Sequence, residues 1–234
     1  MDSLYIVMPA YNEEENIKTT VESWYGCLEG KNASSRLVIA DSGSQDATHQ
    51  ILMELQKRYP QLEILENTER QHGPKVIALY DYAIKRNADY IFQTDSDGQT
   101  NPEEFARFWK LRHKYDGIFG CRNERGDGIA RAMVERVVCA LLRLFFGVKV
   151  PDANAPFRLM KTEIVQKYLY KMRSDYNLPN IMMTTYFAYY HEKIRFIPIT
   201  FKPRQGGVNS INIPKIVKIG WKALGDFREL KREM

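Results

Sequence analysis

The chain has 234 residues, of which 44% are hydrophobic, and a formal net charge of +5. This length and apolar content suit one domain with a substantial core, and they exclude a disordered chain. Its three cysteines, Cys27, Cys121 and Cys139, are scattered without Cys-x-x-Cys spacing, so they predict neither a disulfide framework nor a zinc site.

The positive charge is concentrated in one segment. Residues 200–234 contain eight Lys or Arg and three acidic residues, which accounts for the whole net charge of +5. Such a segment suits an anionic membrane surface, and no nucleic-acid-binding motif accompanies it. No secretory signal and no run of 18 uncharged apolar residues is present. We therefore expect a protein of the reducing cytoplasm, attached peripherally at the cytoplasmic face of a membrane, with no nucleic acid as partner.

Short apolar runs alternate with longer amphipathic segments over the first 120 residues. The short runs predict strands at 4–8, 36–40, 62–65, 90–94 and 117–120. The longer ones predict helices at 13–28, 45–59, 74–86 and 102–115. This alternation predicts an α/β fold with a mostly parallel sheet flanked by helices. Ligands of such sheets bind beyond the carboxyl ends of the strands.

The pattern changes after residue 122. Residues 128–146 predict a helix that is apolar around most of its circumference and carries Arg131, Arg136 and Arg143. A buried helix with snorkelling arginines and a helix in contact with lipid both explain it. Residues 213–234 predict a basic amphipathic helix, for which a membrane surface and the protein core are both possible partners.

The segment from Asp95 to Gln99 reads Asp-Ser-Asp-Gly-Gln and follows a predicted strand. Two carboxylates so placed can turn toward one hard cation, which prefers oxygen ligands and accepts phosphates as co-ligands. A solvated turn before a helix is the alternative, because Asn101 is a good N-cap. An EF-hand calcium loop is excluded, since Thr100 and Ala106 stand where that loop needs Gly and Glu.

Two other loops have helix-start chemistry. Asn12 fits the N-cap of the helix predicted from residue 13, with Glu15 as its capping-box partner. The run of Gly73, Pro74 and Lys75 lies at another predicted helix start, where free N–H groups and the helix dipole favour phosphate. Proline at the first helical position explains that run structurally as well.

Four motifs occur in order along the chain. Residues 7–16 read Val-Met-Pro-Ala-Tyr-Asn-Glu-Glu-Glu-Asn, residues 39–48 read Ile-Ala-Asp-Ser-Gly-Ser-Gln-Asp-Ala-Thr, and the Asp-Ser-Asp segment and Gly-Cys-Arg at 120–122 follow. This order resembles the family 2 glycosyltransferases of GT-A (Rossmann-like) fold. Within them it is similar to the polyprenyl-phosphate sugar transferases of the dolichol-phosphate mannose synthase type. The resemblance runs from about residue 4 to residue 210.

The resemblance implies a site for a UDP- or GDP-linked sugar. The matching residues that would contact the nucleotide sugar are Pro9, Ala10, Tyr11, Glu13, Asp41, Lys75, Asp95, Ser96, Arg122 and Arg204. It also implies that Asp95, Asp97 and Gln99 hold Mg²⁺ or Mn²⁺. Ser42 replaces the second Asp usual in the family, which leaves the nucleobase open.

Residues 150–159 give information about the acceptor. They resemble a segment that reads Asp and then Gly-Phe-Arg in the lipid-phosphate branch, with Pro156 in place of Gly. An acid at Asp152 acts as general base when the acceptor is a hydroxyl. A lipid phosphate is already anionic and needs cations instead, for which Arg131 and Arg158, with Arg204, are suited. Asp152 and Asp97 are the predicted catalytic residues, and the role of Asp152 as base or acceptor contact stays open.

The resulting hypothesis is an inverting, metal-dependent glycosyltransferase that acts on a polyprenyl-phosphate or glycan acceptor in glycoconjugate synthesis. Residues 1–212 would form the GT-A domain, in which 1–125 bind the nucleotide sugar and 126–212 bind the acceptor, and 213–234 would form the basic helix. A sugar-phosphate nucleotidyltransferase, which releases pyrophosphate, is one rival. A catalytically silent binding protein of the same fold is the other.

Overall fold

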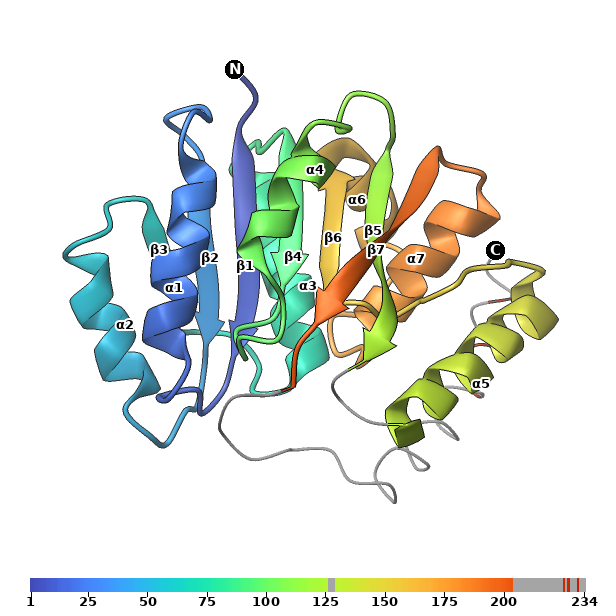
Figure 1. Ribbon diagram of the computed structural model, residues 1–234, viewed down its shortest axis with the longest axis horizontal. Coiled ribbons are helices and arrows are strands. Elements are labelled where there is room, and N and C mark those ends of the chain that lie inside the picture. The colour runs from blue at the N-terminus through green and yellow to red at the C-terminus, as the bar shows by residue number, and fades with distance from the viewer. Residues whose placement is uncertain (126–128, 204–224, 226, 228–230, 232–234) are drawn as a thin grey trace.

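The computed structural model describes residues 1–125, 129–203, 225, 227 and 231. A seven-stranded sheet with the order β3-β2-β1-β4-β6-β5-β7 lies at its centre (Figure 1). The strands are β1 (Leu4–Ala10), β2 (Arg36–Asp41), β3 (Leu62–Leu65), β4 (Tyr90–Thr94), β5 (Gly117–Arg125), β6 (Phe157–Lys161) and β7 (Ile194–Phe201). Neighbouring strands are parallel except around β6, which runs antiparallel to both β4 and β5.

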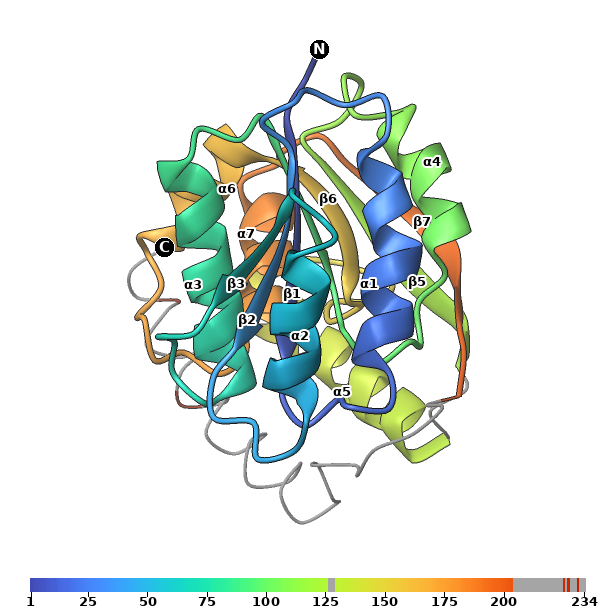
Figure 2. The same cartoon turned by 90° about the vertical axis from the view of Figure 1, so that its left-hand side faces the viewer.

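Helices cover both faces of the sheet. They are α1 (Ile17–Tyr25), α2 (Thr48–Gln56), α3 (His72–Lys85), α4 (Phe105–Trp109), α5 (Ile129–Phe146), α6 (Thr162–Leu169) and α7 (Pro179–Tyr189), with short 3₁₀ turns η1 (Gly26–Leu28) and η2 (Pro102–Glu104). Figure 2 shows α1 and α4 on one side and α3, α6 and α7 on the other. Side chains of α2 belong to the hydrophobic core on the α1 side of the sheet, and those of α5 belong to the core on the α3 side.

The central strand β1 shows why this architecture forms. All seven of its residues are buried. Ile6 and Met8 join the core under α1, whereas Tyr5 and Val7 join the opposite core under α3. A strand that is apolar on both faces is typical of a parallel sheet covered on both sides. The predicted mostly parallel α/β fold is therefore confirmed.

The five predicted strands correspond to β1–β5, whereas the bounds of all four predicted helices differ, most of all those of α1 and α4. Helix α1 begins at Ile17 rather than at residue 13, because Asn12 takes a left-handed conformation with φ of 54°. Its Oδ1 accepts a hydrogen bond from Gln45 N instead of capping the helix. Asn101 does act as a cap, by accepting from Glu103 N, but α4 ends at Trp109.

The predicted helix after residue 122 is confirmed as α5. Within the described residues, no helix combines the length and the apolarity needed to cross a bilayer. The predicted basic helix at 213–234 falls almost wholly outside these residues. Of its described members, Phe227 is buried and its ring centroid lies 5.6 Å from that of Phe146 at the end of α5. The domain division near residue 125 stays a prediction.

Candidate functional site

The loops after β1, β2 and β4 meet at one edge of the sheet, at the lower edge in Figure 1. Asn12 N donates a hydrogen bond of 3.0 Å to Ser44 Oγ, which joins the first two loops. Ser96 Oγ donates one of 2.9 Å to Pro9 O, which joins the first and third. The three motif loops expected beyond the strand ends are thus joined by direct contacts.

The carboxylate of Asp41 is held at the end of β2. Ser44 Oγ donates to Asp41 Oδ1 at 2.5 Å, and His49 Nδ1 lies 3.2 Å from Asp41 Oδ2. Each carboxylate oxygen retains a further lone pair for a ligand. Glu13, also buried, accepts from Asn16 Nδ2 at 3.0 Å. Both acids proposed for the nucleoside are therefore oriented by neighbouring side chains.

Ser42, the departure from the family pattern, has a structural partner. Its hydroxyl donates to Glu66 O and accepts a hydrogen bond of 3.1 Å from Thr68 N. These bonds connect the end of β2 to the segment that follows β3. The serine thus secures the backbone beside Asp41 at a position where the family usually has a second carboxylate.

Lys75 lies beneath the β1 loop. Its side chain is 1% exposed, and its Nζ donates to Ala10 O at 2.5 Å and lies 5.4 Å from the centroid of the Tyr11 ring. Burial lowers the pKa of Lys75 to about 8, and the nearby charge of Asp41 opposes this effect only in part. Tyr11 above it is 44% exposed and presents its ring at the site surface.

Gly73 has a packing role. A Cβ added at this position would lie 2.3 Å from Tyr176 O and 2.6 Å from Asn177 Cα. No side chain fits in that space, so glycine allows the first turn of α3 to approach the segment before α7. This contact supports the structural interpretation of the Gly-Pro-Lys run at residues 73–75.

The Asp-Ser-Asp segment begins beyond β4. Asp95 Oδ1 lies 3.3 Å from Gln93 Nε2 and 3.4 Å from His72 Nε2. Asp97 Oδ1 accepts from Gln99 N at 3.1 Å. Gln99 Nε2 donates to Lys202 O at 2.8 Å, so the amide oxygen of Gln99 is the atom left to serve as a ligand.

These donors fit a hard divalent cation. Two carboxylates and an amide oxygen are all-oxygen ligands, which Mg²⁺ and Mn²⁺ prefer. Among the described residues, no group of three or more His, Cys, Asp or Glu is placed to hold a metal. A complete shell at this edge would therefore draw its other oxygens from substrate phosphates and water, as is usual for Mg²⁺.

His72 and Gln93 support Asp95 and were missed by the sequence reasoning. Partial desolvation disfavours the charged imidazole, but the hydrogen bond to Asp95 and the charges of Asp95 and Asp97 raise the pKa of His72. Side chains that orient a ligand are a general feature of metal sites. The available signal was a histidine at the very start of a helix whose first turn meets the site.

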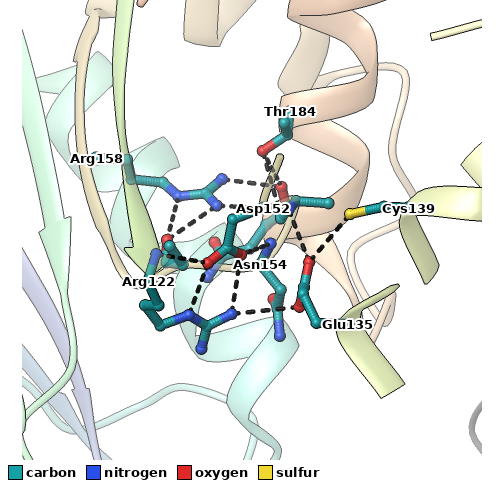
Figure 3. A network of polar contacts seen from close by, with 10 residues as sticks. Arg122, Glu135, Cys139, Asp152, Asn154, Arg158 and Thr184 are labelled. Carbon is teal, nitrogen blue, oxygen red and sulfur yellow. Dashed lines mark hydrogen bonds and ion pairs between the residues drawn. The ribbon is translucent and has the colours of Figure 1, made fainter. Parts of the chain in front are cut away.

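The second half of the site is a network of buried charges (Figure 3). Asp152 accepts from Arg122 Nε at 2.8 Å, from Arg122 Nη2 at 2.9 Å and from Arg122 N at 3.1 Å. Glu135 of α5 lies 3.2 Å from Arg122 Nη2 and accepts from Ala153 N at 2.7 Å. Burial opposes ionisation of Asp152, but the bonds from Arg122 and its charge hold the pKa of Asp152 below its usual value.

Arg158, expected as an acceptor clamp, is 1% exposed. Its guanidinium donates to main-chain carbonyls, among them Asn180 O at 2.9 Å and Ala155 O at 3.1 Å. Thr184 Oγ1 donates to Ala153 O at 2.9 Å in the same region. Arg158 thus fastens the segment around Ala153 to α7. Such contacts between distant segments leave no signal in the sequence.

Of the two remaining predicted cationic residues, Arg131 and Arg204, the structure describes one. Arg131 lies in the first turn of α5 and is partly exposed. Arg204 lies outside the described residues.

Comparison with known proteins identifies the family. The family model "Glycosyl transferase family 2" matches residues 5–169. The chain belongs to glycosyl transferase family 2. An undecaprenyl-phosphate 4-deoxy-4-formamido-L-arabinose transferase of Photorhabdus laumondii is 23% identical over 222 residues, which cover 94% of this chain and 66% of the relative. The polyprenol monophosphomannose synthase of Mycolicibacterium smegmatis is 24% identical over 216 residues, covering 88% and 80%. This family 2 chain thus spans just under two thirds of the length of the first relative.

Solved structures share the fold of this family 2 chain. The glucosyl-3-phosphoglycerate synthase of Mycobacterium tuberculosis, in complex with Mn²⁺ and uridine-diphosphate-glucose, superposes with a TM-score of 0.69 at 15% identity, covering 95% of this chain and 77% of that one. TarS 1-349 of S. aureus gives a TM-score of 0.58 at 17% identity, covering 86% and 60%.

Proposed function

We propose that this family 2 member transfers a sugar, with inversion and with the help of a divalent cation, from a nucleotide sugar to a polyprenyl phosphate. The observation that carries the choice of acceptor is the burial of Asp152 in its multiple pairing with Arg122. The donor and the cation rest on the joined loops at the edge of the sheet.

The donor would occupy the edge formed by the loops after β1, β2 and β4. Tyr11 offers an exposed ring for a nucleobase, and Asp41 and Glu13 offer oriented carboxylates beside it. The names of the relatives do not fix the base, and Ser42 leaves it open between uracil and guanine. The neighbour solved with Mn²⁺ and uridine-diphosphate-glucose has the same fold and supports this placement.

Asp95, Asp97 and the amide oxygen of Gln99 would hold Mg²⁺ or Mn²⁺ at this edge. When bound, such an ion neutralises the charge that develops on the departing nucleoside diphosphate. Gln93 and His72 hold Asp95 in place for that contact. Lys75 adds positive charge beneath the β1 loop.

The acceptor follows from the chemistry of Asp152. A general base is most effective when its pKa lies near the working pH. Arg122 holds the pKa of Asp152 below its usual value, so the carboxylate is a weak base. An alcohol acceptor needs its proton removed, whereas a phosphate monoester is anionic near neutral pH and attacks the anomeric carbon directly. The pair therefore favours a lipid phosphate over a hydroxyl.

The relatives support this choice of acceptor. One is named as a transferase to undecaprenyl phosphate and another as a polyprenol monophosphomannose synthase. A polyprenyl phosphate resides in a membrane, so the protein must work at its surface.

Helix α5 offers a surface for that contact. Its side chains Met133, Val137 and Leu144 are exposed, with Arg136 and Arg143 exposed beside them. Exposed apolar side chains flanked by arginines suit a membrane surface that contains anionic lipid. We accordingly place the protein at the cytoplasmic face of a membrane, with α5 in contact with it.

The test is an assay of the full chain with a panel of UDP- and GDP-sugars, Mn²⁺, and a short polyprenyl phosphate. The matched control acceptor is the corresponding polyprenol. We expect sugar transfer and nucleoside diphosphate release with the phosphate alone. Equal transfer to the alcohol would contradict the acceptor assignment. Release of pyrophosphate in a parallel assay with a nucleoside triphosphate and a sugar 1-phosphate would indicate a nucleotidyltransferase, and absence of any donor binding would indicate a silent binding protein.

A further inference from the structure

Glu135 is an acidic residue on the buried face of α5. It shares that face with Cys139, Leu142 and Phe146, which lie four, seven and eleven residues further along the helix, and its side chain is 12% exposed. A buried carboxylate is costly unless it is paired and hydrogen-bonded. Its partners therefore decide what it does.

The two carboxylate oxygens of Glu135 contact two different segments. Oε2 lies 3.2 Å from Arg122 Nη2 on β5. Oε1 accepts a 2.7 Å hydrogen bond from Ala153 N, in the loop before β6. Figure 3 shows the Glu135 side chain in contact with Arg122 and with Cys139 Sγ. One carboxylate on α5 thus connects the strand that carries Arg122 to the loop that carries Asp152.

This connection fixes the orientation of Arg122. Arg122 donates from Nε and Nη2 to Asp152, and its Nη2 also donates to Glu135. The centroid of the Phe201 ring lies 5.2 Å from the guanidinium carbon of Arg122. Removal of the Glu135 charge would take away one of the contacts that orient the Arg122 guanidinium. Loss of the whole side chain would also release the backbone at Ala153.

We infer that Glu135 is a positioning residue for sugar transfer. It holds Arg122 and, through Ala153 N, the Asp152 segment in the geometry that the acceptor phosphate meets, and it does so without touching either substrate. This inference rests on the proposed function, and it assigns Arg122, predicted from the sequence as a nucleotide-sugar contact, to the acceptor half of the site because of its pairing with Asp152. The sequence offered one signal for it, an acid on an otherwise apolar helix face.

The variant Glu135→Gln tests the inference, with Glu54→Gln on the exposed face of α2 as matched control. Glutamine keeps the length of the side chain and can still accept from Ala153 N. Its other terminal group is then an N–H donor that faces Arg122. We expect kcat for transfer to fall roughly tenfold to a hundredfold, the size of a misplacement effect, while the donor KM stays within about twofold of the wild type.

A second measurement separates positioning from a general loss of structure. In the Arg122→Gln background, Glu135→Gln should lower kcat by less than about twofold more, because its effect acts through Arg122. An undiminished loss in that background overturns the inference, and so does a Glu135→Gln variant as active as Glu54→Gln. If Glu135→Gln does not fold, Glu135→Asp replaces it. Aspartate keeps the negative charge, but its shorter side chain moves the carboxylate away from Arg122, and we expect the same fall in kcat at constant donor KM.

The outcomes also separate this inference from the function on which it rests. A wild-type chain that transfers no sugar to a polyprenyl phosphate overturns both. A wild-type chain that does so, together with a Glu135→Gln variant of unchanged kcat, overturns only the role of Glu135.

Discussion

The carboxylates in the proposed donor half and in the proposed acceptor half of the site differ in exposure and in pairing. On the donor side, the Asp95 side chain is 25% exposed, and its neighbours hold one oxygen while leaving it open to an incoming ion. On the acceptor side, Asp152 is 3% exposed and is paired within the protein. The donor half thus leaves a carboxylate accessible to a cation, whereas the acceptor half neutralises its carboxylate with an arginine of the same chain. Four predictions test this contrast, from the largest expected effect to the smallest.

The largest effect is expected on the donor side. Asp97→Ala removes one of the two carboxylates proposed to hold the cation, so transfer should fall by roughly a thousandfold, about 4 kcal/mol of barrier. Calorimetry with Mn²⁺ and a nucleoside diphosphate should then detect no metal-dependent binding. Asp81→Asn, in an exposed pair with Lys85 on α3, is the control and should bind normally. Intact binding by Asp97→Ala would refute the assignment.

Asp152→Asn should mainly weaken the fold at neutral pH. Because the folded pKa of Asp152 lies below its ordinary 3.8, the carboxylate stabilises the protein above about pH 4, and this is lost as the pH falls through the lowered value. We expect the variant to lose about 3 kcal/mol at pH 7, since Arg122 loses its main partner. The loss should shrink near pH 3. Urea unfolding at both pH values checks this, and an equal loss at both would contradict it.

Lys75 is a buried cation on the donor side, and its effect on stability should appear in the alkaline range rather than in acid. Its folded pKa of about 8 lies below its ordinary 10.5, so the unfolded chain binds more protons between these values and stability rises with pH there. Lys75→Met should remove this rise, of the order of 2 kcal/mol. Thermal unfolding between pH 7.5 and 10 measures it. A variant that keeps the full rise would show that another group is responsible.

The smallest effect is expected at Tyr11, whose ring is exposed at the donor edge. Tyr11→Ala should raise the donor KM about fivefold, roughly 1 kcal/mol, which is at the lower end of the range for a base stacked on an aromatic ring. Tyr11→Phe keeps the ring and should change the KM little. Steady-state kinetics with saturating acceptor distinguish them, and identical values for Ala and wild type would remove Tyr11 from the site.

The sequence predicted the meeting of the three motif loops better than the network around Asp152, and the reason is physical. Strands β1, β2 and β4 are continuous apolar runs, and their polar loops must meet at one edge of a parallel sheet, so local patterns suffice. The wrong start of α1 arose because Asn12 bonds to Gln45 across loops rather than along the helix. Strand β6 was not predicted, because the charge of Arg158 within it is satisfied by main-chain carbonyls, among them that of Asn180, which is 22 residues away. The role of Glu135 likewise depends on two distant segments.

The antiparallel strand β6 has a consequence for the way the two substrates meet. Arg158 lies directly opposite Gln93 in the ladder between β6 and β4, and partners of that kind have Cα atoms only about 5 Å apart. Gln93 supports Asp95, while Arg158 fastens the loop of Asp152. In the proposed function, main-chain hydrogen bonds between β4 and β6 would thereby set the separation between leaving group and nucleophile. Changes in the surrounding loops would then alter the choice of the proposed sugar or lipid while this spacing is preserved.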